Sequence, residues 1–191
     1  MRQTRTLYLL AIGIVCTLAL PAKADSIAIT YSLTGMGTVV GATDTTLTLL
    51  GQFSGSVLSG NPSLDAAWNP VTYTDHSVAD LTTGLLNGTF TMTFANGDTL
   101  SGTVFEDVSA IIASSTQTGS FTQALTFTGG TGEFAGATGS TSGNGFAGAT
   151  VTTVSGSGTV NAPAIPEPGS LALAVFGIVG LAVYRRCRHA G

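Results

Sequence analysis

One histidine and two nearby carboxylates are the residues of this sequence best suited to chemistry. His76 directly follows Asp75, and Asp80 comes four residues later. A serine nucleophile paired with such a histidine is expected in a Gly-x-Ser-x-Gly turn, which the sequence lacks. The three side chains would also suit a metal ion, but Thr74–Asp80 is polar and turn-like. We therefore interpret it as a solvated loop, and we expect no catalytic residue, metal site or cofactor.

Other polar and aromatic candidates have simple structural interpretations. Glu106 and Asp107 resemble a carboxylate pair, but adjacent residues of a strand point to opposite faces. The spaced aspartates of a calcium-binding loop are absent from the sequence. Trp68 stands between two alanines and Asn69-Pro70, so we expect it to pack a loop and not to stack on a sugar.

The elements that would position these residues are β-strands. Thr89–Phe94 alternates apolar and threonine residues, Asn96-Gly97 follows as a turn, and apolar residues then alternate again up to Val104. This pattern predicts a β-hairpin with one buried face. A three-residue loop, Asn96–Asp98, would place Phe94 opposite Leu100 and Phe90 opposite Val104, whereas a two-residue turn would mix the faces.

Further strands are predicted at spacings of about ten residues. The segments with suitable alternation or β-propensity are Ser26–Leu33, Thr46–Phe53, Phe121–Phe127 and Val151–Val160. Only Val108–Ala113 has a helical pattern. Short, evenly spaced strands predict an all-β domain, either a single antiparallel β-barrel or a β-sandwich.

Charge divides the chain sharply. Between Asp25 and Asn161 there is no lysine or arginine, and nine carboxylates give that stretch a net charge of −9. They are Asp25, Asp44, Asp65, Asp75, Asp80, Asp98, Glu106, Asp107 and Glu133. A domain without cations cannot neutralise phosphates, which excludes nucleic acid as a partner. The stretch also lacks cysteine, so no disulfide or thiolate metal site stabilises it.

The N-terminal residues have the pattern of a secretory signal peptide. Arg2 and Arg5 precede an apolar run from Leu7 to Leu20, and Ala22 and Ala24 occupy the small-x-small positions of a cleavage site. We expect signal peptidase to cleave after Ala24, once the general secretion machinery has engaged the segment.

The C-terminal residues have the pattern of a short membrane anchor. An almost uninterrupted apolar run, Gly169–Tyr184, would form a helix of about 24 Å. This is slightly shorter than a typical hydrocarbon core, and snorkelling arginines would make up the difference. Arg185, Arg186 and Arg188 would hold this end in the cytoplasm, with the domain on the opposite side of the inner membrane.

This tail resembles the PEP-CTERM sorting domain, also known as the ice-binding protein C-terminal domain, a label that describes only the tail. The resemblance rests on Pro166-Glu167-Pro168, the apolar run and the terminal arginine cluster, which Cys187 interrupts. It implies recognition by an exosortase, a membrane transpeptidase of Gram-negative bacteria that make extracellular polysaccharide. Pro166, Glu167 and Pro168 would be the sorting motif, and Arg185, Arg186 and Arg188 would retain the tail in the membrane.

A glycine-rich segment, Gly129–Gly139, lacks the lysine and the following helix of a phosphate-binding loop. It is similar to the "GGTGxF" segment of the dirigent and allene-oxide-cyclase-like barrels. That resemblance implies a turn between late strands and favours an eight-stranded antiparallel barrel, while a generic glycine-rich hairpin remains the alternative. No active-site residue of those barrels can be placed in this sequence.

The sequence thus predicts five segments: a signal peptide (1–24), an acidic β domain (25–161), a linker with the Pro-Glu-Pro motif (162–168), a transmembrane helix (169–184) and a basic tail (185–191). The protein would pass through an inner-membrane-anchored intermediate to the cell surface or medium. We interpret it as a non-catalytic surface or matrix protein associated with exopolysaccharide. A small-ligand-binding barrel, including one with isomerase- or cyclase-like activity, is the alternative, with ice or carbohydrate binding by a threonine array as a third.

Overall fold

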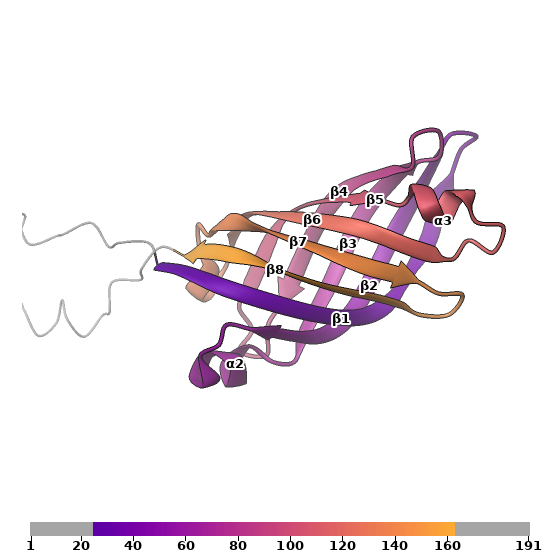
Figure 1. The fold of residues 1–191 in the computed structure, drawn as a ribbon. Coiled ribbons are helices and arrows are strands. Elements are labelled where there is room, and N and C mark those ends of the chain that lie inside the picture. The colour runs from indigo at the N-terminus through magenta and orange to yellow at the C-terminus, as the bar shows by residue number, and fades with distance from the viewer. Residues whose placement is uncertain (1–24, 163–191) are drawn as a thin grey trace, which may run out of the picture. The chain divides into compact units, whose positions relative to one another are not determined.

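Eight antiparallel strands close into a barrel. A computed structural model of the chain describes residues 25–162. The strands are β1 (Asp25–Ala42), β2 (Thr46–Leu58), β3 (Val71–Asp80), β4 (Leu85–Thr93), β5 (Thr99–Asp107), β6 (Gly119–Gly130), β7 (Thr138–Ala147) and β8 (Thr152–Ala162). Each pairs with its neighbours in sequence, and β8 pairs with β1 (Figure 1). The prediction of an all-β antiparallel barrel is confirmed, in the barrel form and not the sandwich form.

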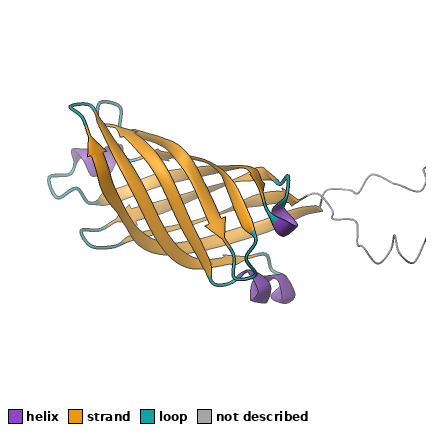
Figure 2. Cartoon of the chain, turned by 180° about the vertical axis from the view of Figure 1, so that it is seen from behind, coloured by secondary structure: helices purple, strands orange, loops and turns teal. Residues whose placement is uncertain are grey.

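Short helical segments lie in connections at the barrel ends (Figure 2). They are α2 (Pro62–Trp68), α3 (Ser109–Ala113) and η1 (Gly132–Phe134). α2 begins where the Asn61 side chain accepts a 3.0 Å hydrogen bond from the Ser63 N–H, with Pro62 in the first turn. α3 confirms the helical pattern of Val108–Ala113, whereas α2 was not predicted. No helix within residues 25–162 is both long and apolar enough to cross a membrane.

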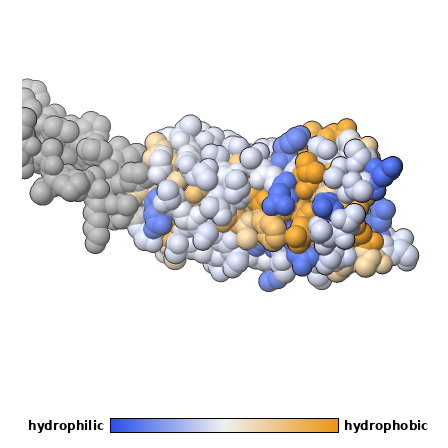
Figure 3. Space-filling model, turned by 90° about the horizontal axis from the view of Figure 1, so that it is seen from above, coloured by the Kyte–Doolittle hydropathy of each residue, from blue (hydrophilic) through white to orange (hydrophobic). Residues whose placement is uncertain are grey.

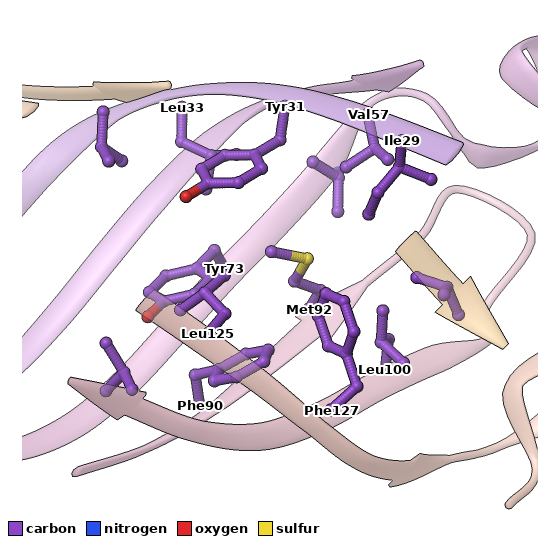
Figure 4. Close-up of a cluster of buried hydrophobic side chains, with 14 of the residues drawn as sticks. Ile29, Tyr31, Leu33, Val57, Tyr73, Phe90, Met92, Leu100, Leu125 and Phe127 are labelled. Carbon is purple, nitrogen blue, oxygen red and sulfur yellow. The ribbon is translucent and has the colours of Figure 1, made fainter. Parts of the chain in front are cut away.

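The inward residues of the strands form one hydrophobic core. On β6, for example, Phe121, Leu125 and Phe127 are at most 6 % exposed, while Thr122 and Thr126 between them are exposed. Figure 4 shows part of this core, including Ile29, Tyr31, Leu33, Val57, Tyr73, Phe90, Met92, Leu100, Leu125 and Phe127. Burial of this apolar surface is the main stabilising contribution available to a domain without disulfides.

Three aromatic side chains close one end of the barrel. Trp68 of α2 lies 5.6 Å from Phe94 and 5.4 Å from Phe134 of η1, measured between ring centroids, and Phe94 and Phe134 stack at 4.7 Å. Trp68 is 1 % exposed, and its indole N–H donates to Glu133 Oε2 at 3.2 Å. The prediction that Trp68 packs a loop is confirmed.

The predicted β4–β5 hairpin is present, but its predicted register is wrong by two residues. Met92, and not Phe94, pairs with Leu100, and Gly88 pairs with Val104. Phe94 leaves the ladder, and its N–H donates to the Asp98 carbonyl at 2.9 Å, so the loop has five residues. A shift of two residues keeps every side chain on its face, so alternation alone could not detect it. The packing of Phe94 against Trp68 and Phe134 selects the longer loop.

The glycine-rich segment connects β6 to β7 through η1, as the resemblance to barrel proteins implied. Its φ angles are +57° at Gly132 and +73° at Gly136, a left-handed conformation that favours glycine. The segment therefore makes a tight turn at the end of the barrel. The predicted signal peptide and transmembrane helix lie outside the described residues.

Much of the barrel surface is polar. Figure 3 shows hydrophobic residues gathered toward one end of the barrel, while most of the visible wall has intermediate hydropathy. Large hydrophobic residues exposed near that end include Val39, Val40, Val78 and Ile112. The intermediate hydropathy is that of the serine, threonine and glycine residues that occupy much of the wall.

Candidate functional site

The stretch from Thr74 to Asp80 is part of strand β3, so its prediction as a solvated loop was wrong. Its polar residues obscured the alternation, because two of the inward positions are Asp75 and Ser77. His76 points outward and is exposed, whereas Asp75 points inward and is half-buried. The histidine and the two aspartates therefore do not converge. No group of three potential metal ligands exists among residues 25–162.

Asp80 and Asp107 are structural residues of turns. Asp80 Oδ1 accepts hydrogen bonds from the Thr82 N–H at 2.7 Å and the Thr82 hydroxyl at 2.6 Å. Asp107 Oδ1 accepts from the Ser109 N–H at 3.1 Å, where α3 begins. These hydrogen bonds lower the pKa of each carboxyl below its usual value. Glu106 faces inward while Asp107 is exposed, so the prediction that they point to opposite faces is confirmed.

A row of directly paired residues runs along the inner face of the barrel wall. Glu106 on β5 pairs with Gln123 on β6, which pairs with Gly143 on β7. Gly143 pairs with Gly156 on β8, and Gly156 pairs with Tyr31 on β1. The two polar side chains and the tyrosine thus lie at one level of the barrel, separated by two glycines.

The glycines let Tyr31 reach across two strands. A Cβ atom at Gly143 would lie 2.7 Å from the Tyr31 hydroxyl oxygen, and one at Gly156 would lie 2.6 Å from it. Both distances are too short for a real contact, so only glycine leaves room for the ring. The Tyr31 hydroxyl donates to Gln123 Oε1 at 2.8 Å, and Gln123 Nε2 donates to Glu106 Oε1 at 2.7 Å. The result is a hydrogen-bonded chain from β1 to β5.

A second carboxyl and two further hydroxyls share this interior. Asp75 Oδ2 accepts from the Ser77 hydroxyl at 2.9 Å. The Tyr73 hydroxyl oxygen is buried and makes no hydrogen bond to another described residue, and the Thr141 hydroxyl is buried beside that of Tyr31. Tyr73 is 2 % exposed and stacks on Phe90 at 5.5 Å between centroids. Figure 4 shows the Tyr31 and Tyr73 rings in one core, with both hydroxyl oxygens on the same side of it.

Burial dominates the proton affinities of these groups. It raises the pKa of Glu106 to about 7; the Gln123 hydrogen bond offsets part of this rise, and the charge of Asp75 adds to it. Burial also raises the pKa of Asp75, opposed by the Ser77 hydrogen bond. The pKa of Tyr31 rises to about 12 through burial, partly offset by the nearby Thr141 hydroxyl, and that of Tyr73 rises well above its usual value, chiefly through burial.

The interior cluster of Tyr31, Tyr73, Asp75, Glu106 and Gln123 is therefore the candidate site. With its pKa raised to about 7 by burial, Glu106 could donate a proton to, or accept one from, a small polar ligand near neutral pH. Of these residues, the sequence interpretation singled out only Asp75 and Glu106. The signal it missed was the polar residue at an inward position, such as Gln123 between Phe121 and Leu125, which marks a polar group inside the core.

A family model of the PEP-CTERM protein-sorting motif matches residues 164–188. The resemblance of the tail is thereby confirmed, and the motif implies export of the protein through a membrane-anchored intermediate. The matched range includes Pro166, Glu167 and Pro168 together with the arginine cluster, all outside the described residues.

Two solved structures have a weak likeness of fold to this chain. One is the pterocarpan synthase dirigent protein GePTS1, with a TM-score of 0.45 and 15 % identity, covering 75 % of this chain and 92 % of that chain. The other is the pterocarpan synthase dirigent protein PsPTS1, with a TM-score of 0.44 and 15 % identity, covering 73 % and 97 %. No curated protein sequence matches the chain.

Proposed function

We propose that this chain is a non-catalytic protein of the bacterial surface or extracellular matrix, handled by an exosortase and associated with exopolysaccharide. The sorting motif at residues 164–188 supports export and recognition by the exosortase. The observation that carries the non-catalytic part is the filling of the barrel. A barrel built to hold a substrate would be expected to leave space between its walls, and this interior is occupied by side chains.

Side chains from neighbouring strands cover the glycine positions of β7 and β8. Tyr31 covers Gly143 and Gly156, while the Phe121 ring lies so close to Gly145 that a Cβ there would clash with it. Trp68, Phe94 and Phe134 close the end of the barrel beyond this core. Such an interior favours a structural or surface-binding role.

The two ends of the chain carry the signals that would direct its processing by the cell. Signal peptidase cleaves after Ala24, having recognised Ala22 and Ala24, and residues 169–184 hold the exported domain at the inner membrane. Arg185, Arg186 and Arg188 keep the tail in the cytoplasm until the exosortase cleaves near Pro166-Glu167-Pro168. The domain then reaches the cell surface or the medium. Its net charge of −9 would keep copies soluble and apart.

A small-ligand barrel is the second candidate, and one specific observation favours it. The Tyr73 hydroxyl, buried without a partner among residues 25–162, lies in the same interior as Glu106 and Asp75. Buried polar groups without partners are rare in folded proteins, and a bound ligand would satisfy them. An isomerase- or cyclase-like activity would require Glu106 as the proton-transferring group.

The test of the main proposal replaces Pro166, Glu167 and Pro168 with alanine in the native host. We expect loss of C-terminal trimming and accumulation of the chain in the inner membrane, measured by fractionation and intact-mass analysis. The matched control, Pro163→Ala, changes the preceding spacer and should be trimmed normally. Unchanged trimming and surface delivery of the motif variant would contradict the proposal.

A further inference from the structure

Three adjoining depressions, which together are called the groove, lie over the wall formed by β6, β7, β8 and β1, and most of their lining residues point outward. The largest, of about 770 Å³, lies over β6, β7, β8 and the adjoining strand β1. It shares Ala124, Ser142 and Ser157 with a second depression of about 440 Å³, and Asn144 and Ser155 with a third of about 410 Å³. Because the shared residues lie in successive rows, the groove follows β7 and β8 from Ser140 to Phe146, about 20 Å at 3.3 Å per residue.

Outward-facing hydroxyl groups line this groove in successive rows across the strands, and these rows are called the hydroxyl ladder. Ser142 pairs with Ala124 on one side and Ser157 on the other, and Ser157 pairs with Thr30. The neighbouring rows repeat this arrangement. They consist of Thr126, Ser140 and Thr159; Thr122, Asn144, Ser155 and Ser32; and Ser120, Phe146, Thr153 and Thr34. The outward side chains thus present donors and acceptors about 4.8 Å apart across strands and about 6.7 Å apart along them.

The ladder is not visible in the threonine pattern of the sequence. Threonine spacing after Thr48 is irregular along the chain. Antiparallel pairing, however, places serines and an asparagine in the positions that threonine leaves open. The array is therefore regular in space although threonine alone is irregular in sequence.

The groove is the uncharged part of an acidic domain. None of the residues that line the three depressions is charged. Asp75 and Glu106 face the interior, and Asp107 lies on β5 beside Thr122, at the border of the groove. A carboxylate at the border, and no cation in the sequence from Asp25 to Asn161, disfavour an anionic ligand.

Two exposed aromatic rings adjoin the hydroxyl ladder. Phe105 lines the largest depression and is 43 % exposed, and Phe146 lines the third and is 51 % exposed. An exposed aromatic ring removes apolar surface from water when a flat ligand packs on it. A ligand that suits this groove is therefore uncharged and long, rich in hydroxyl groups, and apolar on the faces of its rings.

We propose that this groove binds a single extended chain of an uncharged polysaccharide, with the hydroxyl ladder contacting sugar hydroxyls and Phe105 and Phe146 packing on sugar rings. The inference rests on the proposed association with exopolysaccharide and assigns it to one face of the barrel. It also specifies the polymer class, since an anionic polysaccharide would be repelled.

The test measures the mobility of the purified full chain in native gels that contain a soluble polysaccharide. Neutral gels contain hydroxyethyl cellulose, dextran or mannan, and anionic gels contain alginate. The variant Ser142→Val with Ser157→Val removes two paired groove hydroxyls. The control, Thr74→Val with Thr91→Val, removes a directly paired outward couple on β3 and β4. Valine favours strands, so both variants should fold, as circular dichroism will check.

We expect at least one neutral polymer to retard the unsubstituted chain, with affinity reduced about tenfold in the groove variant and unchanged in the control. Retardation by alginate alone, equal retardation of both variants, or no retardation in any neutral gel would overturn the assignment. These outcomes are separate from those of the Pro-Glu-Pro experiment, because trimming and delivery depend on the tail. A chain that is delivered normally but binds no neutral polymer refutes the groove and not the surface location.

Discussion

The barrel wall has two sides whose inward residues differ. Strands β3–β6, the large-residue wall, direct Tyr73, Phe90, Met92 and other bulky groups into the core. Strands β7 and β8, the small-residue wall, direct glycine inward at Gly139, Gly143, Gly145, Gly156 and Gly158. Glycine on one side accommodates the rings that Tyr31 and Phe121 extend over it. The glycine- and serine-rich last third of the domain is therefore part of the packed structure.

The largest expected effect comes from giving the small-residue wall a side chain. Gly143→Val would place carbon atoms against the Tyr31 hydroxyl and the Ser155 carbonyl oxygen. Such overpacking should lower the free energy of unfolding by about 3 kcal/mol, measured by urea denaturation. The matched control, Ser142→Val, changes the adjacent outward residue and should be nearly neutral. Equal stability of the two variants would mean that the small-residue wall does not receive Tyr31.

The next largest effect concerns the ionisation of Glu106, whose carboxyl faces the barrel interior. The pKa of Glu106 is about 7 in the folded chain and 4.5 as its ordinary value. The folded state therefore binds more protons between these values, and stability should fall as pH rises from about 4.5 to 7, by up to about 3 kcal/mol. Below this window the stabilisation is fully present, and above it the loss is complete.

Glu106→Gln tests this pH dependence. The glutamine keeps an acceptor for Gln123 Nε2 but cannot ionise. We expect urea midpoints of the variant to change much less between pH 5 and pH 7 than those of the unsubstituted chain. Asp80 and Asp107, whose pKa values are lowered, act in the opposite direction and only below their ordinary value of 3.8. An unchanged slope in the variant would assign the effect to other groups, with Asp75 the first to examine.

The contrast between the walls explains which features the sequence could predict. Period-two alternation of apolar residues identified the strands around Ile29, Phe90 and Leu125, and the all-β class followed. The same rule missed β3, because Asp75 and Ser77 occupy inward positions and made a buried face look polar. It also gave the β4–β5 register two residues away from the observed pairing, since a shift of two leaves each face unchanged.

The interior site depended on pairing between distant segments. Tyr31 and Gln123 are 92 residues apart and meet only because β8 closes onto β1. Gly143 lies outside the predicted strands and Gly156 lies inside one, but their shared role as space for Tyr31 follows only from the register. The hydroxyl ladder likewise needs antiparallel pairing to bring serine and threonine into common rows.

A smaller effect is expected when Tyr31, whose ring covers the small-residue wall, loses its hydrogen bond to Gln123. Tyr31→Phe keeps the ring over Gly143 and Gly156 but leaves Gln123 Oε1 without its donor. A buried acceptor without a partner should lower the free energy of unfolding by about 1–2 kcal/mol. Urea denaturation at pH 6 measures this change. A neutral result would mean that the Tyr31–Gln123 hydrogen bond contributes nothing net to the barrel.

The same substitution on the large-residue wall should have the smallest effect and the opposite sign. The Tyr73 hydroxyl is buried without a partner among residues 25–162, so Tyr73→Phe removes a desolvated polar group and keeps its stacking on Phe90. We expect a change between zero and about 1 kcal/mol of stabilisation. If instead the barrel holds a small ligand through the Tyr73 hydroxyl, the ligand should raise the melting temperature of the unsubstituted chain. Tyr73→Phe should abolish that rise, although its ring still stacks on Phe90. Comparison of Tyr31→Phe with Tyr73→Phe therefore distinguishes a hydroxyl that stabilises the fold from one that would bind a ligand.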